Sequence, residues 1–163
     1  YCHVRRLNYW EIADLLIPSV MVGLVFGRIG CTLAGCCFGK ACGPDFSLGI
    51  TFDNPLGLGV KNTPLYPTQP ISAANGLLIF LILWLYREKK RFHGELLAIC
   101  LIVYSVTRSL IEILREDPRG FVHLGPLLLS ESQFVSVFML LFAAYVLVWV
   151  RPKQYLSPQP QST

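Results

Sequence analysis

The chain has 163 residues, of which 53% are hydrophobic and only 15% are charged, and its mean hydropathy is +0.52. That composition is too apolar for an ordinary soluble domain and indicates an integral membrane protein. The basic residues that give the formal net charge of +4 gather beside apolar segments. They therefore form no basic face for a nucleic-acid partner, and we expect none.

Four apolar segments are long enough to cross a bilayer core, which takes roughly 20 helical residues. They are residues 10–30, 68–86, 96–114 and 134–150. The first is the least apolar, because it contains Glu11, Asp14 and Pro18. We therefore expect an all-α integral membrane protein with about four transmembrane helices, in which residues 1–155 form a single transmembrane domain. The tail 156–163 is polar and contains prolines, so we expect it to be disordered.

The basic residues indicate how the predicted spans are oriented. They gather before the first span, between the second and third, and after the fourth: Arg5, Arg6, Arg87, Lys89, Lys90, Arg91, Arg151 and Lys153. Positive residues mark cytoplasmic connections, so we expect both chain ends in the cytoplasm. The connections 41–67 and 115–133 then lie on the outer, periplasmic side. The longer one is rich in Gly, Pro and Asn, and we expect residues 48–52 in it to form a short strand.

The third predicted span carries a polar stripe. Its members are Tyr104, Arg108, Glu112 and Arg115. Spacings of four, four and three residues place them within roughly 80° of one another on one helical face. One interpretation is that Arg108 and Glu112 form an ion pair that holds helices together.

The stripe has more positive than negative charge, because it contains two arginines and one glutamate. Arg28 lies near the outer end of the first span, at a depth similar to that of Arg108 and Arg115. Three guanidinium groups at one depth suit a phosphate, which accepts paired hydrogen bonds from an arginine fork. The residues therefore favour a site for a phospholipid headgroup near the outer face.

The chain contains six cysteines, and four of them follow the first span closely. The spacing of Cys31, Cys36, Cys37 and Cys42 allows three interpretations, namely inert packing, disulfide or redox chemistry, and a metal site. Cys42 is the favoured disulfide participant. A metal site is the weakest of the three, because the cluster contains no C-x-x-C unit.

Three motifs in chain order resemble one enzyme family. The first, at residues 27–40, is "GRIG", followed by a further "G" and then by "FGK". The second is "YPTQ" at 66–69, and the third is Tyr-x3-Arg-x3-Glu-x2-Arg at 104–115. Their order and spacing resemble prolipoprotein diacylglyceryl transferase, a bacterial inner-membrane enzyme, over residues 8–152. The chain departs from the family pattern at Cys31, Ala34, Cys36 and Lys40, where the family has Asn, Asn, Glu and Arg, and at Tyr66, where the family has His.

The resemblance implies transfer of the diacylglyceryl group of phosphatidylglycerol to the lipobox cysteine thiol of prolipoproteins, in lipoprotein maturation. The expected partners are phosphatidylglycerol, prolipoprotein signal peptides and the bilayer, with the active site towards the outer leaflet. No metal or soluble cofactor is implied. The implied catalytic residues are Tyr104, Arg108 and Glu112, and the implied lipid-binding residues are Arg28, Gly30, Gly35, Gly39 and Arg115.

The family also carries a His-Gly-Gly segment ahead of the "GRIG" motif, which has no counterpart in these residues. We therefore expect the chain to be the C-terminal portion of a longer enzyme or a truncated relative. Two alternatives remain open. One is a membrane thiol oxidoreductase that uses Cys31, Cys36, Cys37 and Cys42, and the other is an inactive lipid-binding remnant.

Overall fold

A computed structural model of the chain describes residues 7–43, 46–53, 62–115, 121–124 and 127–152, and for 121–124 and 127–131 it describes the backbone alone. In chain order the elements are α1 (Tyr9–Leu33), α2 (Thr68–Tyr86), the 3₁₀ turn η1 (Arg87–Lys89), α3 (Glu95–Ile113), the strands β1 (Phe121–Leu124) and β2 (Leu127–Ser130), α4 (Glu131–Tyr145) and the π-helical turn η2 (Val146–Val150). Each predicted span is thus a helix. The predicted disordered tail lies outside the described residues.

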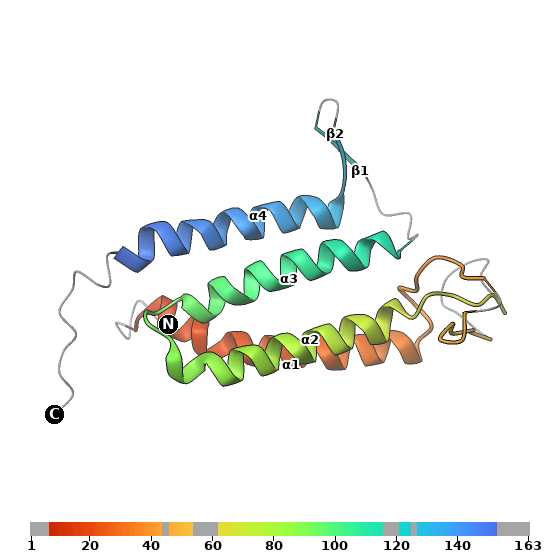
Figure 1. Cartoon of the computed structure of the whole chain (residues 1–163), viewed down its shortest axis with the longest axis horizontal. Helices are drawn as coiled ribbons and strands as arrows, with labels where there is room; N and C mark the ends of the chain where they lie inside the picture. Colours follow the sequence, from red (N-terminus) through yellow and green to blue (C-terminus); the bar gives the residue numbers. More distant parts are fainter. Residues whose placement is uncertain (1–6, 44–45, 54–61, 116–120, 125–126, 153–163) are drawn as a thin grey trace.

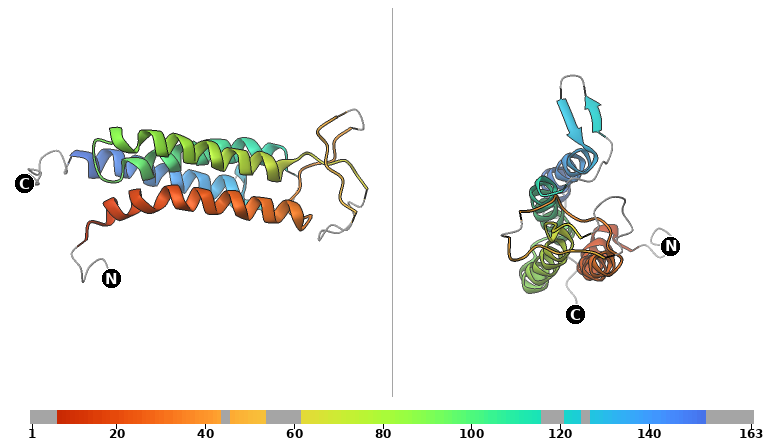
Figure 2. Two further views of the ribbon diagram at one scale, coloured as in Figure 1. Left: turned by 90° about the horizontal axis from the view of Figure 1, so that it is seen from below. Right: turned by 90° about the vertical axis from the view of Figure 1, so that its right-hand side faces the viewer.

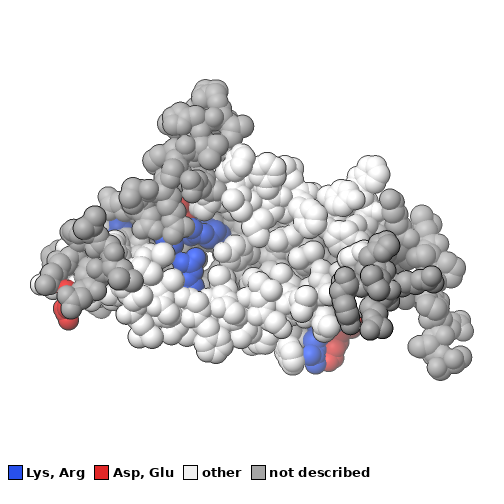
Figure 3. Space-filling model, turned by 180° about the vertical axis from the view of Figure 1, so that it is seen from behind, with Lys and Arg blue, Asp and Glu red and all other residues white. Residues whose placement is uncertain are grey.

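The described helices are long and apolar enough to cross a membrane four times, which confirms the expected all-α membrane fold. They run side by side along the long axis of the molecule (Figure 1). The start of α1, the turn between α2 and α3, and the end of α4 all lie at one end of the bundle. In the space-filling view, most of the described surface between the two ends is uncharged (Figure 3).

The connections at the other end differ from the predicted ones. The strand expected at 48–52 is wrong: Gly49 N donates to Phe46 O at 3.0 Å in a tight turn, and only Ile50 forms a bridge, with Leu65. Two strands do appear in the second connection, where β1 and β2 pair antiparallel as a hairpin. This hairpin projects from the bundle beside the start of α4 (Figure 2).

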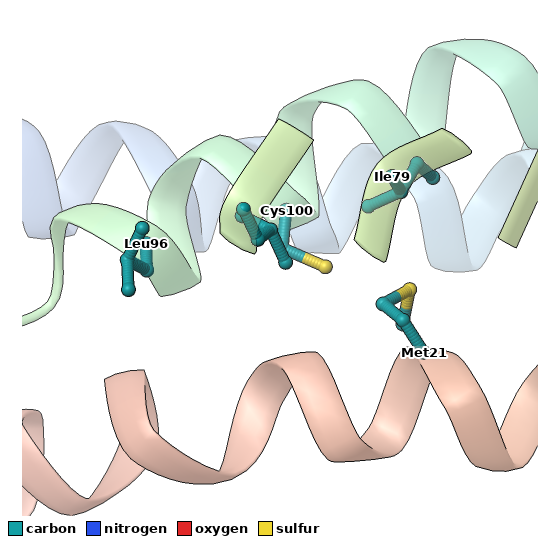
Figure 4. Close-up of a cluster of buried hydrophobic side chains, with 5 residues drawn as sticks. Met21, Ile79, Leu96 and Cys100 are labelled. Atoms are coloured by element: carbon teal, nitrogen blue, oxygen red, sulfur yellow. The ribbon is translucent and has the colours of Figure 1, made fainter. Parts of the chain in front are cut away.

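The helices pack through two apolar clusters. α1 packs on α2 and α3, and the cluster between them contains Met21, Ile79, Leu83, Leu96 and Cys100 (Figure 4). α4 packs on α3, and the second cluster contains Phe92, Ala98, Ala143, Val146 and Val150. Because both clusters use α3, this helix is the centre of the bundle, with α1 and α4 on different sides of it.

Asp14 of α1 joins the first helix to the start of the third. Its side chain is only 1% exposed and accepts hydrogen bonds from Gly94 N at 2.9 Å and Leu97 N at 3.0 Å. Lys90 Nζ lies 3.6 Å from the same carboxylate. The carboxylate therefore caps α3 from another helix, where the helix dipole also favours a negative charge.

Gly94 is needed at this contact. Its φ of 98° is in the left-handed region, and a Cβ there would lie 3.2 Å from the ring of Trp10 and 3.3 Å from Val146. A residue with a side chain would be strained in its backbone and would also push α1 and η2 apart. The junction thus depends on one carboxylate and one glycine.

We predict that Asp14→Ala lowers the free energy of unfolding by about 2 kcal/mol, because it removes the cap and leaves two buried N–H groups unpaired. Circular dichroism of the chain in mixed micelles, as the fraction of denaturing detergent is raised, measures the change. Glu11→Ala is the control, since Glu11 is exposed on the same helix. Equal losses from the two changes would contradict the capping role.

Candidate functional site

An ion pair within the bundle holds two of the predicted site residues together. Arg108 Nη2 lies 2.8 Å from Glu112 Oε2, and the two side chains are only 10% and 14% exposed. Both residues are on α3, one turn apart, so the helix itself positions them. A buried charge needs its partner, and removal of either residue leaves the other uncompensated in an apolar environment.

Arg108 also lines a cavity of about 330 Å³ between three helices. Arg28 comes to it from α1, and Tyr104 comes from α3, one turn before Arg108. The described residues that line this cavity include two arginines and no carboxylate. In the space-filling view, Lys and Arg atoms gather around a hollow towards the end that carries the long connection (Figure 3). The cavity therefore favours an anion.

One donor in this cavity is unused. Arg108 Nη1 is buried and has no hydrogen-bond partner among the described residues, although Nη2 of the same guanidinium faces Glu112. A buried N–H group without a partner is costly, and its cost disappears when a ligand accepts from it. An arginine with one edge fixed by a carboxylate and the other edge open is suited to hold a phosphate oxygen.

A second, apolar cavity of about 410 Å³ adjoins the first, because Tyr104 and Met139 line both. Its other lining residues are apolar: Ile17, Val20, Met21, Leu24, Cys100 and Leu101. It lies in the space that α1 and α4 leave open on α3. A cavity lined by two arginines thus continues into an apolar one.

Helix α4 contributes residues that the sequence analysis did not identify. Ser132, Val135, Ser136 and Met139 line the cationic cavity, and Ser136 is only 4% exposed. Ser136 Oγ donates to Ser132 O at 2.8 Å. The only signal in the sequence was a pair of serines four residues apart at the start of an apolar span, which is also common in helices that bind nothing.

The remaining predicted lipid-binding residues are not among those that line this cavity. Gly30 lies within α1, as the predicted first span has it, and Gly35 has a φ of 61° and turns the chain after that helix. Gly39 forms a bridge with Arg115 just beyond α3, and Arg115 is 6% exposed. Their roles in lipid binding stay predictions.

Gly39 sits where three segments meet. A Cβ at this position would lie 2.7 Å from Tyr66 O, 2.8 Å from Leu114 O and 2.8 Å from Thr68 Cγ2. Two of these atoms belong to the backbone, so they cannot move aside. Its own N–H donates to Tyr66 O, and Lys40 N donates to Leu114 O at 2.9 Å. The loop after α1 is thereby attached to the start of α2 and the end of α3.

The loop that carries Cys36 and Cys37 is held by the first turn of α2. Gln69 Nε2 donates to Cys36 O at 2.9 Å, and Thr68 Oγ1 donates to Cys37 O at 3.2 Å. Thr68 and Gln69 are almost completely buried. These two side chains belong to the "YPTQ" motif, so the motif has a structural role that the sequence analysis did not assign.

None of the five cysteines that the structure describes is in a disulfide, and this includes Cys42. Cys31, Cys36 and Cys37 lie together, whereas Cys42 is buried elsewhere in the connection. Burial, together with contacts to the thiols of Cys31 and Cys37, raises the pKa of Cys36 to about 11. A thiol with such a pKa is protonated at neutral pH and is a poor nucleophile, which does not favour the oxidoreductase interpretation.

A model of the prolipoprotein diacylglyceryl transferase family matches residues 1–149. The chain is similar to phosphatidylglycerol–prolipoprotein diacylglyceryl transferase 2 of Clostridium perfringens, with 42% identity over 137 residues, which are 84% of the chain and 51% of the relative. It is 39% identical to the Clostridium tetani transferase over 90% of the chain and 56% of that relative. The chain therefore spans about half the length of these relatives.

We predict opposite effects of alanine at two of the site glycines. Gly39→Ala lowers the free energy of unfolding by about 2–3 kcal/mol, because the new methyl group meets fixed backbone. Gly30→Ala raises it by about 0.5–1 kcal/mol, because a Cβ there meets nothing within 4 Å and alanine favours the helix. Unfolding in mixed micelles measures both. A loss of stability in Gly30→Ala would show that α1 is packed more closely than the structure indicates.

Proposed function

The chain belongs to the prolipoprotein diacylglyceryl transferase family, and we propose that it takes part in the transfer of a diacylglyceryl group from phosphatidylglycerol to the lipobox cysteine of a prolipoprotein. The observation that carries this proposal is the cavity that Arg28 and Arg108 line together, next to an apolar cavity. The named relatives act on the same pair of substrates.

The arginines are proposed to hold the phosphate of the lipid. Arg108 offers its open Nη1 while Glu112 fixes the other edge of the guanidinium, and Arg28 supplies a second fork from α1. Tyr104 lines the same cavity and offers a hydroxyl group to the headgroup. Positive groups fixed in a water-poor site stabilise the charge that grows on a departing phosphate, and they need no reorganisation during the reaction.

The reaction replaces one bond with another. The sulfur of the lipobox cysteine forms a bond to the glyceryl carbon, the bond from that carbon to the phosphate oxygen breaks, and glycerol phosphate leaves with the electron pair. The thiol proton must go to a base. The described residues that line the cavity include no base at neutral pH. We therefore propose that the base comes from the part of the full-length relatives that this chain does not match.

The apolar cavity is proposed to hold part of the acyl chains. It lies deeper in the bundle than the arginines, and it is lined by residues of α1, α3 and α4, among them Ile17, Leu24 and Met139. It is partly open to the outside of the bundle, so a lipid can enter sideways from the bilayer. Burial of each acyl-chain methylene group in this cavity contributes about 0.8 kcal/mol to lipid binding. Because the acyl chains are held there, the headgroup stays at one depth, beside the arginines.

The orientation of the bundle follows from its charges. Arg87, Lys89, Lys90 and Arg91 lie at the same end as the start of α1 and the end of α4 (Figure 1). Basic residues favour the cytoplasmic side. We propose that this end is cytoplasmic and that the cavity with Arg28 and Arg108 faces the outer leaflet, in a bacterial inner membrane.

Lipid transfer to a synthetic lipobox peptide tests the proposal. The assay uses membranes that contain the chain together with the half of the Clostridium perfringens relative that the match leaves uncovered. We expect Arg28→Ala and Arg108→Ala to lower the rate on the order of 10²-fold each, since each removes a fixed positive donor. Arg108→Lys keeps the charge and the pairing with Glu112 but loses the fork, so we expect about a tenfold loss.

Two controls separate this proposal from its alternatives. Arg87→Ala removes an exposed arginine at the opposite end and leaves the rate unchanged. Cys42→Ser also leaves it unchanged if the reaction is lipid transfer, whereas an oxidoreductase that uses the thiols loses activity. If Arg28→Ala and Arg108→Ala each transfer lipid at the full rate, the phosphate site is rejected. If neither the parent chain nor any variant transfers lipid, the result favours the lipid-binding remnant.

A further inference from the structure

Three thiols converge where the chain leaves α1. The Sγ atoms of Cys31, Cys36 and Cys37 all lie within 4.8 Å of one another. Cys31 belongs to the last turns of α1, and the other two follow in the loop. Within the part of the chain that the structure describes, this is the one group of cysteine, histidine or carboxylate side chains close enough to hold a metal ion.

Three hydrogen bonds hold the backbone around the thiols. Cys36 N donates to Cys31 O at 3.1 Å, which closes the turn, and Cys37 has a φ of 60°, which reverses the chain direction. The buried side chains of Gln69 and Thr68 hold the carbonyl groups of Cys36 and Cys37. This scaffold brings the three sulfur atoms together before any ligand binds, so little conformational entropy is lost on binding.

The number of sulfur ligands selects the ion. Structural Zn²⁺ sites take four protein ligands in a tetrahedron, and the described residues offer three. Soft thiolate ligands suit Cu(I) as well as Zn²⁺, and Cu(I), a d¹⁰ ion that accepts low coordination numbers, is stable with three sulfur neighbours. A metal–sulfur distance of about 2.3 Å places three sulfurs in a trigonal plane about 4.0 Å apart. The thiols need only a small contraction to reach that arrangement.

We propose that Cys31, Cys36 and Cys37 bind one Cu(I) ion as a three-thiolate site. Binding replaces three S–H bonds with three Cu–S bonds and releases three protons, and neither copper nor sulfur changes its oxidation state. The occupied site has a net charge of −2. This site departs from the expectation that no metal is needed.

A bound Cu(I) ion would also stiffen the loop after α1, which contacts the end of α3 near the proposed phosphate site. The loop that carries Cys36 and Cys37 continues to Lys40, whose N–H donates to Leu114 O at the end of α3. Glu112 lies two residues before that carbonyl on the same helix end. Binding of Cu(I) therefore restrains the loop that packs against the end of α3.

Competition with a coloured Cu(I) chelator such as bicinchoninate tests the proposal on the full 163-residue chain, reduced and held in detergent without oxygen. We expect one equivalent of Cu(I) per chain, and X-ray absorption at the copper edge should report three sulfur neighbours. Cys31→Ser, Cys36→Ser and Cys37→Ser each lower the affinity by about tenfold or more, since a hydroxyl group is a poor ligand for a soft ion. Circular dichroism checks that each variant keeps its helices.

Cys42→Ser and Cys100→Ser are the matched controls, because both are buried cysteines outside the group. They should bind Cu(I) as tightly as the parent chain. Three results would overturn the proposal: no competition by the parent, unchanged binding after Cys36→Ser, or displacement of Cu(I) by equal Zn²⁺. Lipid transfer is no part of this measurement, so failure of the copper site and failure of the proposed transferase activity are distinguishable.

Discussion

A polar side chain inside this bundle has to find its partner within the protein, because lipid offers no hydrogen bonds. That constraint accounts for the polar contacts inside the bundle. Asp14 caps α3 from α1, and Asn75 Nδ2 of α2 donates to Thr107 Oγ1 of α3 at 2.9 Å. Arg108 and Glu112 pair within α3. The helices pack through apolar clusters, and the contacts of Asp14 and Asn75 add polar links from α1 and α2 to α3.

The same constraint produces the site. Arg108 has two edges: Nη2 on one forms an ion pair with Glu112, and Nη1 on the other has no hydrogen-bond partner among the described residues. An unsatisfied guanidinium edge in a cavity is stable only when something fills it, whether water or an anionic group. The arginine of α1 faces the same space, so the cavity has an excess of positive charge beside an apolar neighbour. The folded bundle does not need two arginines without a carboxylate in one cavity for its own stability. Their presence there therefore indicates an anionic ligand.

The outer connection depends on close backbone packing. Gly39 lets the loop, the start of α2 and the end of α3 touch, and Thr68 and Gln69 use their buried side chains to hold the loop's carbonyl groups. The cluster of Cys31, Cys36 and Cys37 side chains results from this packing. Sequence spacing placed Cys36 and Cys37 side by side, which argues against a shared ion. The left-handed backbone of Cys37 turns both sulfur atoms to the same side.

The sequence by itself determined the four spans, because hydropathy and helix length depend on residues close together in the chain. It also determined the pairing of Arg108 with Glu112, since residues one turn apart share a helical face. Only the tertiary structure decided that Ser132 and Ser136 line the cavity of the arginines, because two serines at the start of an apolar helix do not specify which way that helix is rotated. Likewise, the meeting of three thiols depends on hydrogen bonds from a helix more than thirty residues away, and no local pattern records such contacts.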